Sequence, residues 1–222
     1  METAAERARF NMVQQQIRPW DVLDDRVLEA MASVRRESFV PDAYQGLAYA
    51  DIEIPIDESQ SMLPPKVVGR MLQALAVKPG DRVLEIGTGT GYVTACLSQL
   101  GKRVISIEYN PGLASEARAR LASAGLESVV EVREGDGLAG PVEGGPFDVI
   151  AVTGSMPTEA ALPMLQGQLA AGGRLFCILG VAPVMEAVLI TRVAEGDFRR
   201  AGLFETCTPP LANVVEPDGF EF

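Results

Sequence analysis

Three clusters of glycine and acidic residues follow apolar runs and could together hold a ligand. The first is the loop 85–91, Glu-Ile-Gly-Thr-Gly-Thr-Gly, which overlaps the end of the apolar run 82–86. Glu108 ends the next run, and the triplet 135–137, Gly-Asp-Gly, follows a third. Ligands of parallel α/β sheets bind beyond the carboxyl ends of the strands. We therefore expect the three clusters to line one crevice.

The spacing of the glycines separates the candidate ligands. A dinucleotide fingerprint, GxGxxG, would place its third glycine at position 92, which is Tyr92 here. No Lys-Ser or Lys-Thr pair follows the loop, so it is not a P-loop. Glu85 at the strand end would repel a pyrophosphate but suits a cationic group, such as the ammonium of S-adenosylmethionine.

The other two clusters fit the same cofactor. The Glu108 carboxylate can accept hydrogen bonds from both ribose hydroxyls, and Asp136 can accept one from an adenine amino group. The alternative is that each cluster is a set of turn glycines with a helix-capping acid, and this explains any one of them taken alone.

The composition excludes several kinds of chemistry. The chain of 222 residues contains no histidine and three widely separated cysteines, which excludes Ser-His-Asp and Cys-His catalysis and leaves no zinc-ligand pattern. A net charge of −11 argues against nucleic-acid binding, which needs cations to displace phosphate counterions. No apolar run is long enough to span a membrane, and the first residues lack the pattern of a signal peptide. We expect a cytoplasmic protein without a metal site; the composition says nothing about its oligomeric state.

The elements that must position these residues alternate between strand and helix. Apolar runs predict strands at 82–86, 103–108, 129–133, 147–152 and 174–179, with helices at 92–100, 111–124 and 163–169 between them. Residues 1–45 and 66–76 are typical of helices, and 46–64 of a loop. Two further strands, at 185–193 and 203–207, would complete one sheet edge.

This order predicts an α/β protein with a mainly parallel, doubly wound sheet, a Rossmann-like core and an N-terminal helical extension. We expect a single domain, 1–222. Its parts would be N-terminal helices and a substrate loop (1–78), the cofactor-binding core (79–208) and a C-terminal tail (209–222).

Several motifs resemble the protein-L-isoaspartate O-methyltransferase family over about residues 11–180. The segments 15–18, 25–28, 36–41 and 48–51 are similar to its N-terminal helical region. Residues 84–95, Leu-Glu-Ile-Gly-Thr-Gly-Thr-Gly-Tyr-Val-Thr-Ala, are similar to its cofactor motif. The resemblance continues through 135–137, 146–148 and 168–175. It implies a Rossmann-like class I methyltransferase fold.

The family transfers a methyl group from S-adenosylmethionine to the free carboxylate of an isoaspartyl residue in a damaged protein, and the ester then closes to a succinimide. Such a transfer needs little acid–base help, because the carboxylate is already ionised near neutral pH. The lack of histidine is therefore no obstacle. The loop and the resemblance together imply these cofactor contacts: Glu85, Ile86, Gly87, Thr88, Gly89, Gly91, Glu108, Tyr109, Gly135, Asp136 and Gly137.

One segment departs from the family. Where the family usually has Gly-Gln-Thr-Ile-Ser-x-Pro, residues 59–65 are Ser-Gln-Ser-Met-Leu-Pro-Pro. The family's serine next to the reacting carboxylate falls on Leu63, which has no hydroxyl. We expect Ser61, or a loop amide near Gln60, to take over the catalytic, acceptor-positioning role, with Ser59 and Gln60 binding substrate. The alternative is that these are ordinary loop serines.

Three functions remain open from the sequence. The first is a carboxyl methyltransferase that acts on isoaspartyl residues or another aspartate-like carboxylate. The second is a divergent S-adenosylmethionine-binding homologue without isoaspartyl activity, which acts on another acceptor or through partners. The third is a small-molecule methyltransferase. Asp51 could be a helix or turn cap or could line the cleft. Phe204, Phe220 and Phe222 could cover the cleft, contact another subunit or pack at an edge.

Overall fold

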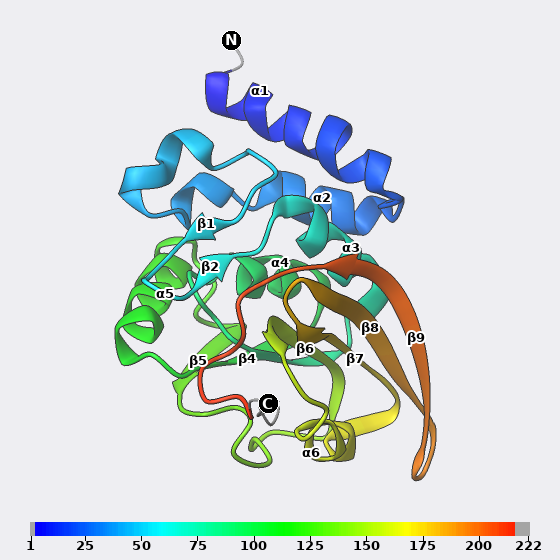
Figure 1. Cartoon of the computed structure of the whole chain (residues 1–222). Helices are drawn as coiled ribbons and strands as arrows, with labels where there is room; N and C mark the ends of the chain where they lie inside the picture. Colours follow the sequence, from blue (N-terminus) through cyan, green and yellow to red (C-terminus); the bar gives the residue numbers. More distant parts are fainter. Residues whose placement is uncertain (1–2, 216–222) are drawn as a thin grey trace, which may run out of the picture.

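The computed structural model describes residues 3–215 and is organised around one seven-stranded sheet (Figure 1). In chain order its strands are β3 (Arg82–Ile86), β4 (Arg103–Glu108), β5 (Val130–Glu134), β6 (Phe147–Met156), β7 (Leu169–Val181), β8 (Val184–Ala194) and β9 (Asp197–Thr206). Their spatial order is β5-β4-β3-β6-β7-β8-β9. Neighbouring strands from β5 to β7 in this order pair parallel. The pairs β7–β8 and β8–β9 are antiparallel. The predicted parallel sheet with an antiparallel edge is confirmed.

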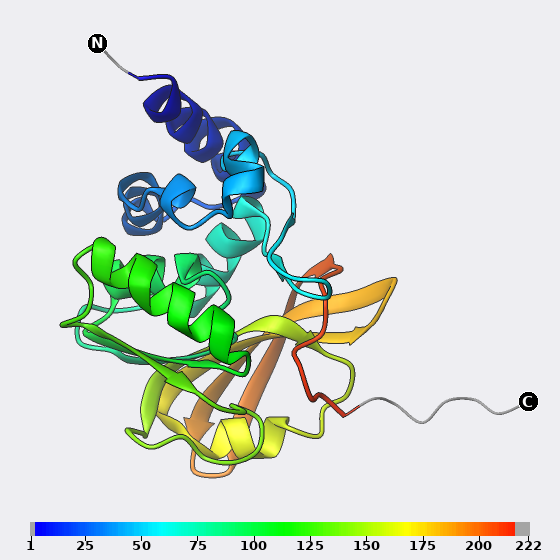
Figure 2. The same cartoon turned by 90° about the vertical axis from the view of Figure 1, so that its left-hand side faces the viewer.

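Successive side chains of each strand point to opposite faces of the sheet. Val83, Val104 and Val149 pack in a core cluster with α3 (Pro65–Leu75), α4 (Tyr92–Leu100) and part of α5 (Pro111–Ser123). The alternate strand residues form a second cluster with the short helix α6 (Leu162–Gly167). Figure 2 shows α5 above the sheet and α6 below it. The apolar runs are continuous because both faces are covered.

The N-terminal segment adds a further layer on the α3 and α4 side, at the top of Figure 1. It consists of α1 (Ala4–Asn11), η1 (Met12–Ile17), η2 (Arg18–Trp20), α2 (Asp25–Ser33), η3 (Arg36–Ser38) and η4 (Asp42–Leu47). Met12, Ile17 and Phe39 are buried in the same cluster as Met71 and Val83. The core on this face therefore runs without a break from the N-terminal helices to the sheet.

The segment 46–64 is more ordered than the sequence predicts. It contains a short hairpin of β1 (Ile54–Pro55) and β2 (Ser61–Met62), in which Ile54 pairs with Met62. The Asp57 carboxylate closes the turn by accepting hydrogen bonds from the amides of Ser59 (2.8 Å) and Gln60 (2.7 Å). An Asx turn of this kind has no apolar periodicity, so pattern reasoning assigns it to a loop.

Three strands are longer than predicted: β6, which ends at Met156 rather than at residue 152, β7 and β9. β7 begins at Leu169, where the sequence predicts the end of a helix, and β9 begins at Asp197 rather than at residue 203. Residues 197–202 of β9 are mostly exposed and include Arg199 and Arg200. An edge strand with one neighbour can carry polar residues, so it lacks the apolar run that marks a buried strand.

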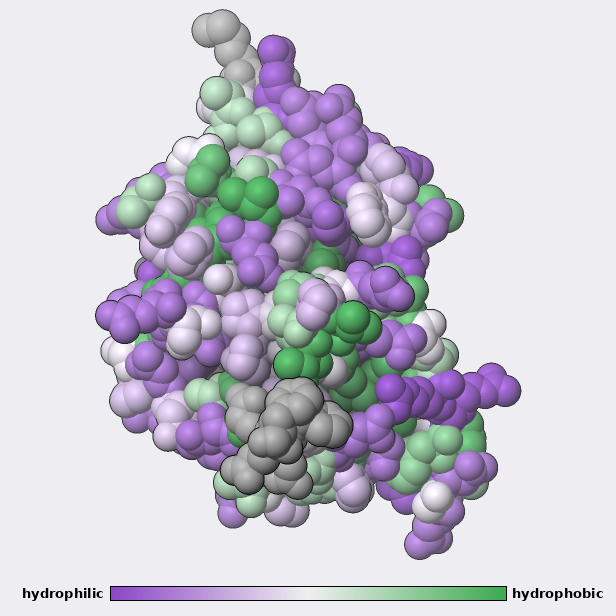
Figure 3. Space-filling model, viewed as in Figure 1, coloured by the Kyte–Doolittle hydropathy of each residue, from purple (hydrophilic) through white to green (hydrophobic). Residues whose placement is uncertain are grey.

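The surface and the thiols complete the outline. Figure 3 shows apolar residues in scattered patches on a largely polar face. Within residues 3–215, no helix is long and apolar enough to cross a membrane. All three cysteines are free; Cys96 and Cys177 are buried, whereas Cys207 is exposed. Burial raises the pKa of the Cys96 and Cys177 thiols to about 12.

Candidate cofactor and acceptor site

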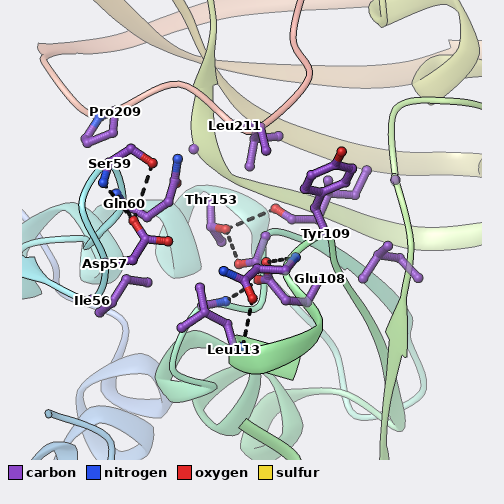
Figure 4. A pocket seen from close by; sticks show the side chains of 18 of the residues that line it. Ile56, Asp57, Ser59, Gln60, Glu108, Tyr109, Leu113, Thr153, Pro209 and Leu211 are labelled. Atoms are coloured by element: carbon purple, nitrogen blue, oxygen red, sulfur yellow. Dashed lines mark hydrogen bonds between the residues drawn. The ribbon is translucent and has the colours of Figure 1, made fainter. Parts of the chain in front are cut away.

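A cleft of about 220 Å³ lies at the carboxyl ends of β3, β4, β5 and β6 (Figure 4). Its walls come from three parts of the chain that are distant in sequence. The strand ends carry Ile86, Gly87, Gly89, Glu108, Tyr109, Gly135, Asp136 and Gly137; the hairpin carries Ser59, Gln60 and Ser61; and Pro209 and Leu211 come from the C-terminal segment. The sheet therefore brings the three predicted clusters together.

The glycine loop needs its glycines for conformation and for space. Gly87 has φ +94° and Gly89 has φ +53°, both in the left-handed region that favours glycine. A Cβ on Gly87 would lie 2.5 Å from Oγ1 of Thr153. The loop is tied to β4 by the Gly87 amide, which donates to the Ile107 carbonyl at 2.9 Å. Because the glycines have no side chains, a ligand in the cleft can approach the loop backbone closely.

Two backbone amides fix the orientation of the Glu108 side chain. Its Oε2 accepts a hydrogen bond from the Gly89 amide at 2.8 Å, and its Oε1 accepts one from the Asn110 amide at 2.9 Å. Only 7% of the residue is exposed. An ionised carboxylate has about four acceptor sites, so each oxygen keeps capacity for a hydroxyl donor. The side chain is thus oriented before a ligand arrives.

The 135–137 triplet forms the third wall. The Asp136 Oδ1 accepts from the Leu138 amide at 2.8 Å, which orients the carboxylate at the cleft. A Cβ on Gly137 would lie 2.9 Å from Cγ2 of Ile86, whereas one on Gly135 would meet open space. Tyr109 lies at the edge of the cleft opposite the hairpin (Figure 4).

The structure corrects the expectation for Glu85. Its carboxylate is fully buried beneath α4, where Oε2 accepts hydrogen bonds from the hydroxyls of Thr94 (2.5 Å) and Ser106 (2.6 Å). It does not line the cleft, because strand alternation turns it to the face that carries Val83. Burial raises the pKa of the Glu85 carboxyl to about 8.

Thr88 and Gly91 also lie outside the main cleft. The Thr88 hydroxyl is 2.5 Å from the Ser106 hydroxyl, and the Gly91 Cα faces Leu121 of α5. Thr88 instead lines a second, smaller pocket. The loop therefore presents Gly87 and Gly89 to the main cleft and packs its remaining side against the core.

The charged side chains of the cleft share one sign. Among the described residues that line it, these are Asp57, Glu108 and Asp136. Carboxylates without a neighbouring lysine or arginine favour a positively charged ligand and disfavour a pyrophosphate. The inference of a cationic ligand therefore holds, although it rests on these residues rather than on Glu85.

An inner pocket of about 40 Å³ adjoins the cleft on the side of the N-terminal helices. Gly87, Gly89, Ser61 and Thr153 line both spaces. Among the described residues the Ser61 hydroxyl has no hydrogen-bond partner. By contrast, the Ser59 hydroxyl lies 3.3 Å from Oδ1 of Asp57. Ser61 is thus the serine of the hairpin that is free to meet a ligand between the two spaces.

Three other residues that the sequence analysis named make contacts within the protein. The side-chain amide of Gln60 donates to the Pro210 carbonyl at 3.0 Å, so it joins the hairpin to the C-terminal segment. Asp51 accepts from the Lys66 amide at 3.0 Å and pairs with its ammonium at 3.0 Å, as a cap of α3. Phe204 lies on β9 under Arg70, at 5.1 Å from its guanidinium, which is edge packing. Phe220 and Phe222 lie outside the described residues.

Sequence reasoning missed two parts of the site. The Thr153 hydroxyl lies 3.0 Å from the Ile86 carbonyl, directly behind the glycine loop. It follows the predicted strand 147–152, so the strand-end rule could have found it. The segment 208–212, whose Pro209 and Leu211 border the cleft, carries no pattern that marks it as part of a site.

Known proteins are similar to this chain in sequence. The model of the protein-L-isoaspartate(D-aspartate) O-methyltransferase family matches residues 7–206. A protein-L-isoaspartate O-methyltransferase of Methylorubrum extorquens is 44% identical over 210 residues, which cover 94% of this chain and 90% of the relative. One of Aeropyrum pernix is 41% identical over 207 residues, which cover 92% of this chain and 79% of the relative.

Solved structures agree in fold. A putative protein-L-isoaspartate O-methyltransferase from Plasmodium falciparum, in complex with S-adenosyl-L-homocysteine, superposes with a TM-score of 0.79 at 20% identity and covers 95% of this chain and 99% of its own. Another structure described as a protein-L-isoaspartate O-methyltransferase gives a TM-score of 0.80 at 25% identity, with 96% and 67% covered. With a family match over most of its length and relatives above 40% identity, the chain belongs to the protein-L-isoaspartate(D-aspartate) O-methyltransferase family.

Proposed function

We propose that this protein uses S-adenosylmethionine to methylate the free carboxylate of isoaspartyl residues in damaged proteins. The observation that carries the proposal is the acidic cleft at the strand ends, with Glu108 oriented by the Gly89 and Asn110 amides. Family membership supports both the cofactor and the acceptor.

The residues present fit this cofactor. Glu108 would accept hydrogen bonds from the ribose hydroxyls, and Asp136 would accept one from the adenine amino group. Gly87 and Gly89 would lie along the amino-acid part, since they border both the cleft and the inner pocket. The open space at Gly135 leaves room for a planar base, which a side chain there would occupy.

The chemistry asks the protein to align and shield rather than to move protons. When bound, S-adenosylmethionine supplies a sulfonium-activated methyl group, which a carboxylate oxygen takes up as the carbon–sulfur bond breaks and a neutral thioether leaves. The protein holds the acceptor in line and keeps water out. In the methylated product the neighbouring backbone nitrogen then displaces methanol from the ester and closes a succinimide.

Ser61 is the residue we assign to the acceptor. Ser61 lines both the cleft and the inner pocket, and its hydroxyl lacks a partner among the described residues, so it can donate to a carboxylate oxygen. Ser59 and Gln60 line the cleft but not the inner pocket, and their side chains hydrogen-bond to Asp57 and to the Pro210 carbonyl. We assign them to shaping the substrate entrance.

The test is transfer of labelled methyl from S-adenosylmethionine to an isoaspartyl peptide. The matched control is the same peptide with a normal aspartyl bond. We expect base-labile label in the isoaspartyl peptide only. If the cofactor binds but neither peptide is labelled, the proposal fails. The second candidate, a homologue that acts on a different acceptor, would then hold; buried Leu63 at the family's serine position favours it.

A further inference from the structure

Arg36 is an unusual residue of the inner pocket. It begins η3, is fully buried and lines the pocket together with Tyr92 and Leu63. Its Nη2 donates to the Leu63 carbonyl at 3.1 Å, and its guanidinium carbon lies 4.6 Å from the centre of the Tyr92 ring. A guanidinium stays charged in proteins. A full positive charge is therefore held beside the place where the family has its serine.

Three of the four polar side-chain atoms of this pair have no hydrogen-bond partner among the described residues. Within residues 3–215, the Nε and Nη1 of Arg36 and the hydroxyl of Tyr92 are buried without a hydrogen-bond partner. No carboxylate of that part of the chain forms an ion pair with Arg36; the nearby Asp51 is engaged by Lys66. An unpaired buried charge is costly unless an anion compensates it. An anion would supply the missing partner.

The pocket has the size of one small anion. A cavity needs roughly 10–15 Å³ to hold one water molecule. The inner pocket, at about 40 Å³, therefore has room for about three non-hydrogen atoms, which is the size of a carboxylate group. Ser61 and Thr153 line the pocket on the side of the cleft, where methyl transfer would take place.

We propose that Arg36 and Tyr92 form a carboxylate-binding site in the inner pocket that holds a ligand carboxylate for methyl transfer. The site deepens the proposed function and rests on it. Under the proposed function two carboxylates would meet at the glycine loop, that of the isoaspartyl acceptor and that of the amino-acid part of the cofactor. Either has the chemistry the pocket requires. A carboxylate has about four lone-pair sites, so an acceptor held by Arg36 keeps one for the methyl group.

For the acceptor, the site would compensate for Leu63. The guanidinium is already bonded to the Leu63 backbone, so it lies next to the position from which the serine hydroxyl is missing. A charged hydrogen bond to a carboxylate is stronger than one from a neutral hydroxyl.

The experiment removes the carboxylate from each ligand in turn. Calorimetry measures binding of S-adenosylhomocysteine and of its decarboxylated analogue. It then measures binding of an isoaspartyl peptide and of the same peptide with that carboxylate as an amide, with S-adenosylhomocysteine present. The proteins are the wild type, Arg36→Lys, Arg36→Gln and Tyr92→Phe. Arg70→Gln is the matched control, because Arg70 also lies over an aromatic ring but outside the pocket.

In the wild type, loss of the bound carboxylate should weaken binding about 10- to 100-fold, the scale of a charged hydrogen bond. In Arg36→Gln the same loss should change affinity less than about threefold. Tyr92→Phe should reduce the penalty in part, and Arg70→Gln should leave it unchanged. The ligand that shows the effect identifies the source of the carboxylate.

Equal penalties in the wild type and both Arg36 variants, for both ligands, would overturn the proposal. If the variants do not fold, a crystal structure of the wild type with S-adenosylhomocysteine and the peptide decides: a carboxylate within hydrogen-bonding distance of Arg36 supports the site, and a carboxylate elsewhere refutes it. Failure of the proposed function is separate, since the wild type would then not methylate the isoaspartyl peptide at all.

Discussion

The carboxylate of Glu108 combines burial with acceptor capacity for a ligand. Two backbone amides fix its orientation, so little side-chain freedom remains to be lost when a ligand binds. Preorganisation of this kind increases affinity without adding contacts. The residue should therefore contribute strongly to cofactor binding.

We expect Glu108→Ala to weaken S-adenosylhomocysteine binding by about 1–3 kcal/mol, because charged hydrogen bonds to the ligand are lost. Calorimetry measures the change. Glu116→Ala is the control, since Glu116 is an exposed residue that pairs with Arg120 on α5. An affinity that stays the same in Glu108→Ala would remove Glu108 from the cofactor site.

Glu85 makes stability depend on pH. Its pKa is about 8 in the folded protein, chiefly through burial, against 4.5 for the free side chain. Between these values the folded state binds more protons than the unfolded state, so stability falls as pH rises. The contribution of the neutral carboxyl is complete below about pH 4.5 and is lost as pH rises through about 8.

Glu85→Gln should abolish that pH dependence. We expect the free energy of unfolding of the variant, relative to the wild type, to increase by a few kcal/mol, on the order of the shift in pKa, between pH 5 and pH 8. Urea unfolding at several pH values measures the difference, in which other titrating groups cancel. Parallel pH profiles for the two proteins would contradict the burial of a titrating Glu85.

At this scale the sequence predicted residue types well and orientations less well. Glu108, Asp136 and Gly87 lie in the cleft as their strand-end positions indicated. Glu85 does not, although alternation along 82–86 places it on the same face as Val83. The charge of the residue suggested a ligand contact, whereas its place in the pleat determined which way it points.

The segment 208–212 is the element that completes the cleft. Ser155 at the end of β6 donates its amide to the Pro209 carbonyl and accepts from the Leu211 amide, both at 3.0 Å. From the other side, the Gln60 side chain bonds the Pro210 carbonyl. In Figure 1 this red segment passes from β9 beside the cyan hairpin. Hydrogen bonds from the sheet and from the hairpin thus hold the segment 208–212 beside the cleft.

Leu211→Ala should weaken S-adenosylhomocysteine binding severalfold, mainly through faster dissociation, because the Leu211 side chain closes the cleft beside Gly87. Stopped-flow displacement measures the dissociation rate. Val193→Ala, at an exposed residue of β8, is the control. If dissociation is unchanged in Leu211→Ala, the segment borders the site without retaining the ligand.

The elements of the sheet were predictable and this segment was not, for a physical reason. Buried parallel strands require apolar runs, and these are visible in the sequence. The segment is held by hydrogen bonds between backbone groups more than 50 residues apart, such as those between Ser155 and Pro209. Backbone groups are the same in every residue, so no residue type marks the pairing.

The whole molecule shares one continuous core on its helical side. Met12, Val22 and Phe39 of the N-terminal segment belong to the same buried cluster as Val68, Leu97 and Phe176. The N-terminal helices therefore lack a core of their own and depend on α3 and α4 for burial of their apolar side chains.

We expect residues 1–78 and the sheet to unfold in one cooperative transition. Trp20, the single tryptophan, reports on the N-terminal segment by fluorescence, and far-ultraviolet circular dichroism reports on the whole fold. The two probes should give the same urea midpoint, because neither part retains its core without the other. A fluorescence midpoint clearly below the dichroism midpoint would indicate that the N-terminal helices separate first.

If the inner pocket takes the acceptor carboxylate, its small volume would limit which damaged proteins can be repaired. An α-helix with its side chains is about 10–12 Å across, far wider than a space that admits one carboxylate. A lesion within a rigid helix or sheet would then reach the methyl donor only after that stretch unfolds. Repair should therefore favour lesions in loose loops, chain ends and partly unfolded proteins, and the rate at which a client opens would set how long its damage persists.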